Sequence, residues 1–151
     1  MIKANIDTGD LRKLEKKFKK LNVYSERIFV SEANRAIANA RATAVSDAPV
    51  AESFGGTLKQ SIRIRPVKGG GEMYSTVDYA PYVEFGTGSG YLKVNDATKL
   101  GIPEKFIKQF KGRGIKEVNM QPQPFFYRAA GLAYKKMLSR LEKRLKKIIN
   151  E

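Results

Sequence analysis

The chain contains no cysteine, no histidine and no tryptophan. Without cysteine it can form no disulfide, and without cysteine and histidine it lacks the usual ligands of zinc, haem iron and iron–sulfur clusters. The same absences exclude a cysteine nucleophile and a serine activated by histidine. Much of catalysis is therefore implausible, and we expect no zinc, haem or iron–sulfur cofactor.

Long apolar runs are also missing. No segment approaches the roughly 18 apolar residues of a membrane-spanning helix, and the opening residues, MIKANIDTGD, lack the apolar core of a signal peptide. We expect a cytoplasmic product with no membrane partner. With 151 residues, of which 42% are hydrophobic and 29% charged, the chain suits one globular domain, residues 1–151.

Charge of one sign dominates the sequence. Lysine and arginine number 29 against 15 acidic residues, which gives a net charge of +14. Residues 31–87 are neutral overall, whereas residues 1–30, 88–118 and 119–151 carry about +4, +4 and +6. The positive electrostatic field of such a chain favours a polyanionic partner such as nucleic acid, an anionic membrane or an acidic protein surface. Solvated faces of amphipathic helices account for part of the excess, above all in residues 1–30.

Helical periodicity predicts three amphipathic helices. The first has apolar residues at steps of three and four, namely Leu11, Leu14, Phe18 and Leu21. The second, which we expect to end near Asp47 because of the following Pro49, has the apolar stripe Phe29, Ala33, Ile37, Ala40 and Ala44. The last begins at Pro124 and has the seam Tyr134, Leu138, Leu141, Leu145 and Ile148. We expect this helix to pack on a sheet, with its basic end, residues 135–151, directed towards a partner.

Alternation predicts a β-hairpin over residues 58–79. Ile62 and Ile64 alternate with Arg63 and Arg65, and the glycines at 69–71 form the expected turn. A short helical turn from Ala80 to Glu84 follows. Residues 88–120 then form an unusually long connection that we expect to be mobile in the isolated chain, with a short helix beginning at Pro103. The predicted class is α+β, with two N-terminal helices and a long C-terminal helix packed on a small antiparallel sheet.

Catalytic patterns are weak. The glycine-rich GTGSG at 86–90 lacks the lysine of a phosphate-binding loop and is interpreted as a turn. Two close acidic pairs, Asp47 with Glu52 and Asp78 with Glu84, leave a metal-dependent nuclease as a remote alternative. Solvated carboxylates beside turns and helix ends are the more ordinary interpretation.

Basic residues interleaved with aromatic ones offer a second alternative, a nucleic-acid-binding module without sequence specificity. This pattern is matched loosely by residues 106–113 (FIKQFKGR) and 125–128 (FFYR). The sequence contains no signature of an RNA-binding domain or of a zinc finger. Contacts would be made to phosphates and not to bases. The candidate contacts to DNA or to a protein partner are Lys108, Lys111, Arg113, Lys116, Arg140, Lys143, Arg144 and Lys147.

Three short segments follow one another along the chain. The first contains Ala48, Pro49, Gly56, Leu58, Ser61 and Ile62. The second contains Tyr79, Ala80, Tyr82, Val83, Glu84, Phe85, Gly86 and Thr87. The third contains Gln123, Pro124, Phe125 and Ala129. In this order the segments resemble the neck or tail-component family of long-tailed phages, whose reference member is gene product ten of phage Hong Kong 97. The chain departs from the family in the longer connection 88–120 and in Arg128, where the family often has proline.

The resemblance implies a non-enzymatic virion protein of the head–tail junction, similar in fold to tail-terminator and tail-completion proteins. Such a protein is assembled in the host cytoplasm as a homo-oligomeric ring around the DNA channel, between connector and tail proteins. It implies assembly roles for Tyr79, Tyr82, Glu84, Phe85, Gly86, Thr87, Pro124 and Phe125. We expect Glu84 with Gly86 and Thr87 to position the long connection, and Phe125 to anchor the last helix in the core.

Overall fold

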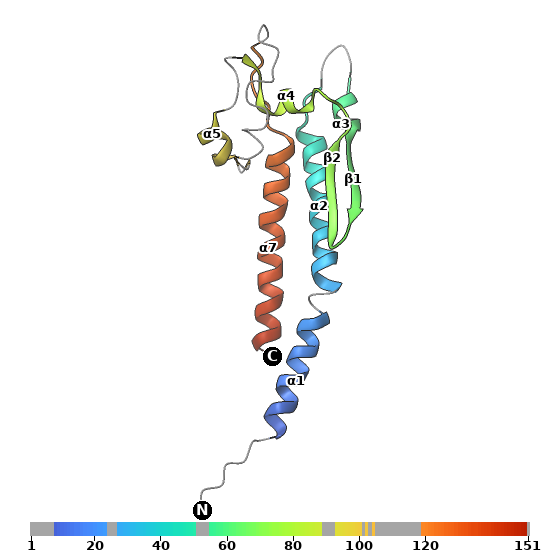
Figure 1. The fold of residues 1–151 in the computed structure, drawn as a ribbon, viewed down its shortest axis with the longest axis vertical. Helices are drawn as coiled ribbons and strands as arrows, with labels where there is room; N and C mark the ends of the chain where they lie inside the picture. The colour runs from blue at the N-terminus through green and yellow to red at the C-terminus, as the bar shows by residue number, and fades with distance from the viewer. Residues whose placement is uncertain are drawn as a thin grey trace, which may run out of the picture.

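The fold combines helices with one β-hairpin, which confirms the predicted α+β class (Figure 1). A computed structural model describes residues 8–23, 27–50, 55–88, 93–100, 102, 104 and 119–150. Its elements in chain order are α1 (Thr8–Val23), α2 (Phe29–Asp47), α3 (Thr57–Ser61), β1 (Ile62–Val67), β2 (Gly70–Ser75), α4 (Ala80–Phe85), α5 (Val94–Lys99) and α7 (Phe126–Asn150).

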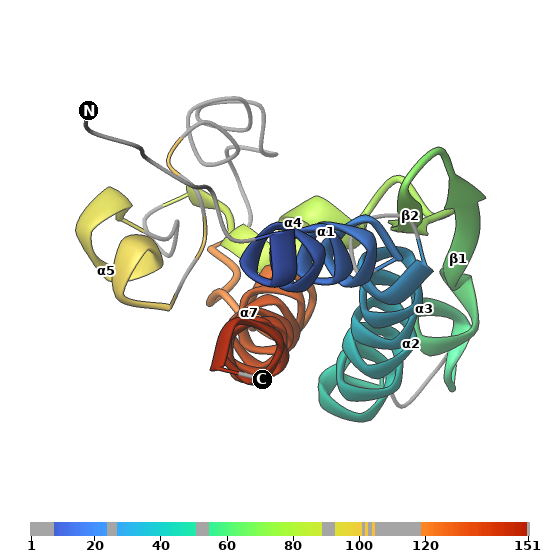
Figure 2. The same cartoon turned by 90° about the horizontal axis from the view of Figure 1, so that it is seen from below.

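Helices α2 and α7 lie side by side and form the centre of the molecule (Figures 1 and 2). Small residues make this possible, because alanine allows two helix backbones to approach closely. Along α2 the buried residues recur every four positions, and they are Glu32, Ala36, Ala40 and Ala44. Along α7 they are Ala129, Ala133, Met137 and Leu141. The spacing of four keeps each set on one slowly turning face of its helix.

The hairpin of β1 and β2 packs on α2, on the side away from α7 (Figure 2). The expectation that α7 packs on the sheet was therefore wrong, because α2 lies between the two. The antiparallel register of the hairpin pairs Ile62 with Ser75 and Val67 with Gly70. The turn is Lys68–Gly69, so the remaining two glycines belong to β2 and not to the turn. A Cβ atom on Gly71 would lie 2.6 Å from Ile37 Cγ2, so glycine is what lets the strand approach the helix.

The apolar stripes expected from sequence are only partly buried. In the terminal seam Leu141 is 8% exposed, whereas Tyr134 and Leu138 are 56% and 39% exposed. The cause is geometric, since α2 covers the face that contains Ala133 and Met137 and leaves the neighbouring face open. The seam predicted from its spacing therefore lies beside the buried face of α7 and shares Leu141 with it.

Helix α1 extends beyond the α2–α7 pair, at the end of the molecule where α7 terminates (Figure 1). It contacts α7, and Lys17 Nζ donates a 2.7 Å hydrogen bond to the backbone carbonyl of Ile149. A cation at a helix C-terminus also complements the helix dipole. The predicted stripe of α1 is largely uncovered, with Leu14 and Phe18 50% and 62% exposed.

The long connection 88–120 is described only in part. Within it, α5 lies on the far side of α7 from α2 (Figure 2), and Ala97 and Ile102 are buried. Most of the helix expected from Pro103 onwards lies outside the described residues. The same holds for much of the connection that we expect to be mobile, so that expectation stays a prediction.

Candidate functional site: the junction of α4 and α7

A buried carboxylate joins the short helix α4 to the start of α7. Glu84 is 2% exposed and accepts three backbone hydrogen bonds at the N-terminus of α7. Its Oε2 accepts from the N–H groups of Phe125 at 2.8 Å and Phe126 at 2.9 Å, and Oε1 accepts from Tyr127 at 3.0 Å. These N–H groups have no acceptor within the helix itself, so Glu84 acts as a cap supplied from another element.

The electrostatics of Glu84 reflect two opposing effects. Burial raises the pKa of the Glu84 carboxyl, while the three N–H donors favour the charged form and oppose that rise. Burial and the neighbouring Glu84 also raise the pKa of Tyr127 to about 12. Both Glu84 oxygens are already engaged, so a metal ion or a substrate could use this carboxylate only by breaking the cap.

A second set of contacts continues the junction past Glu84. The N–H of Thr87 donates to the carbonyl of Met120 at 2.9 Å, and the N–H of Met120 donates to Thr87 Oγ1 at 3.0 Å. Closer to α7, the N–H of Gln123 donates to the carbonyl of Val83 at 2.8 Å. Residues 83–87 and 120–127 are thus joined by two backbone–backbone hydrogen bonds and by the side chains of Glu84 and Thr87.

Glycine is required where α4 ends. Gly86 has φ 74° and ψ 179°, a combination that residues with a Cβ atom adopt at a cost of about 1–3 kcal/mol. This turn directs Thr87 towards Met120. The Gly86–Thr87 pair therefore fixes the path of the chain as it leaves α4.

The aromatic candidates divide into buried and exposed groups. Phe85 and Phe125 are each 1% exposed, and the Phe85 ring lies 5.8 Å from that of Tyr127. Tyr82 and Pro124 are half-buried, whereas Tyr79 is exposed. Pro124 precedes α7, which begins at Phe126, instead of occupying its first position.

All three segments of the phage-like pattern meet in one hydrophobic cluster. The first contributes Ala48, Leu58 and Ile62, the second contributes Ala80, and the third contributes Phe125 and Ala129. From the first segment, Ser61 Oγ donates to the carbonyl of Leu58 at 2.6 Å and hydrogen-bonds Ser75 Oγ at 2.8 Å. Residues about 80 positions apart are thus parts of a single packing unit.

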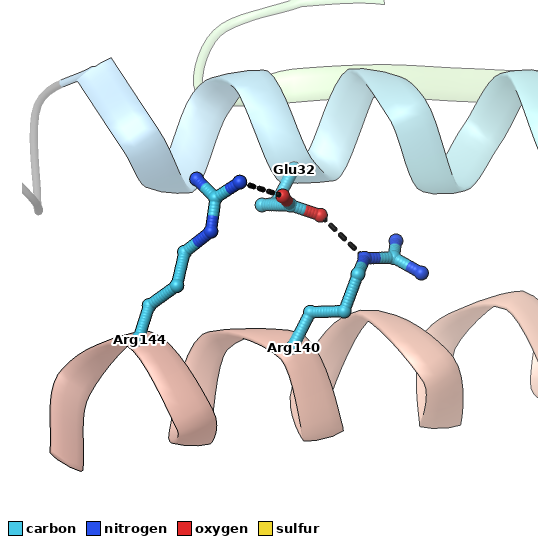
Figure 3. A network of polar contacts seen from close by, with 3 residues as sticks. All are labelled: Glu32, Arg140 and Arg144. Carbon is cyan, nitrogen blue, oxygen red and sulfur yellow. Dashed lines mark hydrogen bonds and ion pairs between the residues drawn. The ribbon is translucent and has the colours of Figure 1, made fainter. Parts of the chain in front are cut away.

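A separate charged cluster lies between α2 and α7 (Figure 3). Glu32, 3% exposed, accepts from Arg140 Nε at 2.6 Å through Oε2, and its Oε1 lies 3.1 Å from Arg144 Nη2. The hydrogen bond from Arg140 and the charges of Arg140, Arg144 and Arg35 lower the pKa of Glu32. Arg140 and Arg144 were predicted from the sequence to contact DNA or a partner. In the structure both pair with Glu32, a carboxylate that the sequence analysis did not select.

The other basic candidates are exposed or lie outside the described residues. Lys143 and Lys147 lie exposed on α7, while Lys108, Lys111, Arg113 and Lys116 lie outside the described residues. Asp78 is exposed, and among described residues no group of three or more acidic side chains is arranged to hold a metal ion. None of the helices in the described ranges combines the length and apolarity needed to cross a membrane.

Sequence reasoning missed the cap on α7, although one signal was present. The first turn of α7 has no acidic residue. A helix that starts in a buried core without its own capping side chain needs an acceptor from elsewhere. Glu84, placed among apolar residues in YVEFG, was the available carboxylate.

Comparison with families of known proteins, with curated proteins and with solved structures found no match to this chain.

Proposed function

We propose that this protein is a non-enzymatic structural subunit of a bacteriophage or prophage particle, acting at the head–tail junction as a neck or tail-completion protein. The observation that carries the proposal is the convergence of the three phage-like segments. They form one hydrophobic cluster and the Glu84 junction, so the residues of the resemblance share a common structural purpose.

Uncovered apolar surface supports an assembling subunit. Leu14 and Phe18 on α1, and Tyr134 and Leu138 on α7, are all more than a third exposed. Large apolar side chains clustered on helix faces are typical of surfaces that meet another protein. The basic faces of the same helices suit a ring whose channel holds DNA, or an acidic neighbouring protein.

Deletion of the gene tests the proposal. Electron microscopy of the resulting particles should show separate heads and tails, or tails of aberrant length, and a wild-type copy supplied in trans should restore joined particles. Normal infectious virions produced without the gene would contradict the proposal.

A basic nucleic-acid-binding module is the second candidate, favoured by a stripe on α7. Lys136, Arg140, Lys143 and Lys147 recur at steps of four, three and four along α7. The three lysines are exposed, and Arg140 is paired with Glu32. If this is the primary function, the isolated chain should bind duplex DNA strongly, with a steep loss of affinity as salt rises. DNA binding that is weak until the protein assembles would favour the particle subunit instead.

A further inference from the structure

Two uncovered surfaces belong to elements at opposite ends of the molecule, α1 and α4 (Figure 1). One is the α1 stripe, which we define as Leu14 and Phe18. The other is a cavity of about 480 Å³, here named the Asp78 pocket, between β2, α4 and the start of α7. Its apolar walls include Met73, Val77, Pro81, Phe85 and Phe126.

The charges of the two surfaces have opposite sign. Helix α1 contains six basic and two acidic residues, so its stripe stands in a positive field. The lining of the Asp78 pocket contains no lysine or arginine, although the whole chain is strongly basic. Its exposed carboxylate is Asp78, because Glu84 is buried and engaged at the start of α7. Asp78 is exposed and has no ion pair with any residue that the structure describes.

Like charges disfavour the simplest pairing, that of α1 with a second α1. Two copies of α1 packed against each other would bring two clusters of lysines together. The Asp78 pocket has both properties that α1 requires, an apolar floor and negative charge. Within one chain the two surfaces are too far apart to meet, since α1 and α4 lie at opposite ends (Figure 1).

We propose that α1 of one copy docks its Leu14–Phe18 stripe into the Asp78 pocket of a second copy. The contact is heterologous, because different surfaces of the two subunits meet. Such a contact repeats from copy to copy and produces a closed ring or an open chain. The cavity volume suits a small number of apolar side chains, and α1, at sixteen residues, provides about 24 Å of helix to extend the contact.

This inference rests on the proposed function in that it supplies the contact from which the proposed ring would be built. It is tested with the full purified chain by sedimentation velocity over a range of protein and salt concentrations. Wild type should self-associate. Leu14→Ala combined with Phe18→Ala should weaken self-association at least about tenfold, and so should Asp78→Lys alone.

Mixing the two variants gives the sharpest result. Each variant retains one intact surface, so an equimolar mixture should form a dimer that does not grow further. Glu142→Lys makes the same charge change on an exposed residue outside the pocket, and Leu100→Ala with Leu132→Ala removes comparable exposed apolar groups. These controls should assemble like wild type, and all variants should keep the wild-type circular dichroism spectrum and thermal midpoint.

Three results would overturn the inference. They are a wild type that stays monomeric, variants that assemble as well as wild type, and a mixture that stays monomeric. Wild-type-like assembly of both variants would reject this contact while leaving ring formation intact. The particle phenotype of the gene deletion then decides the proposed function separately.

Discussion

The carboxylate of Glu84 in α4 accepts a 2.8 Å hydrogen bond from the backbone N–H of Phe125, 41 residues later in the chain. The same carboxylate accepts from Phe126 and Tyr127. A helix N-terminus is therefore held by an acidic side chain from a distant element, and the position of α7 depends on that of α4. This relationship makes the junction sensitive to single substitutions.

Replacement of Glu84 should destabilise the fold. Glu84→Ala leaves three N–H groups without their acceptor in a buried site, and we expect the free energy of unfolding to fall by about 2–4 kcal/mol. Glu84→Gln keeps a carbonyl acceptor and should lose less. Urea unfolding followed by circular dichroism measures both. Glu142→Ala, on an exposed part of α7, is the matched control and should change stability by less than about 0.5 kcal/mol; a Glu84→Ala protein as stable as this control would refute the cap.

The two buried carboxylates should give stability opposite dependences on pH. The pKa of Glu32 is lowered in the folded protein, so its contribution is present above its ordinary pKa of 4.5 and is lost as pH falls below that value. The pKa of Glu84 is raised, so the folded state binds the proton more tightly and stability falls as pH rises above 4.5.

Two conservative variants separate these effects. Glu32→Gln should flatten the loss of stability on the acid side of pH 4.5, and Glu84→Gln should remove the decline on the other side. Thermal midpoints measured between about pH 3 and 7 provide the comparison. Unchanged pH profiles in both variants would show that neither carboxyl titrates as the structure indicates.

Replacement of Phe125 tests how the last helix is anchored. Phe125 is 1% exposed and packs in the cluster shared by the three phage-like segments, so Phe125→Ala should cost about 3–5 kcal/mol of stability. Phe18→Ala is the matched control, because that ring is 62% exposed on α1. Its loss should be small in denaturant titrations of the monomer. Equal losses from the two substitutions would mean that burial of Phe125 is not what holds α7.

Local pattern predicted most of the elements but not their partners. The alternation at Ile62 and the spacing in residues 29–47 reflect contacts a few residues apart. Both β1 and α2 lie within the predicted ranges, although residues 58–61, predicted as part of the hairpin, belong to α3. The packing of α7 on α2 depends on which stripe faces the neighbouring helix. From the sequence we expected the larger Tyr134 and Leu138 to be buried against a neighbouring element. The close approach of α2 and α7 instead buries Ala129 and Ala133.

The polar contacts of the junction were harder to predict for a related reason. Glu84 and Glu32 are buried carboxylates, and their partners lie 41 and 108 positions away in sequence. No local spacing encodes such pairs. The sequence did single out Glu84, Gly86 and Thr87 through the phage-like pattern, but only the structure shows that Glu84 caps α7 and that Thr87 pairs with Met120.

Gly86 offers the most local test of the junction. Its backbone, at φ 74° and ψ 179°, lies in a region that only glycine occupies readily, so Gly86→Ala should lower stability by about 1–3 kcal/mol. The substitution should also loosen the Thr87–Met120 hydrogen bonds, because the chain would leave α4 in a different direction. Hydrogen exchange at the Thr87 amide should therefore become faster in the variant. Gly55→Ala is the control, since a Cβ atom there meets nothing within 4 Å and its backbone φ is not in the left-handed region. If Gly86→Ala proved as stable as Gly55→Ala, with Thr87 exchange unchanged, the turn after α4 would not be what directs the chain to Met120.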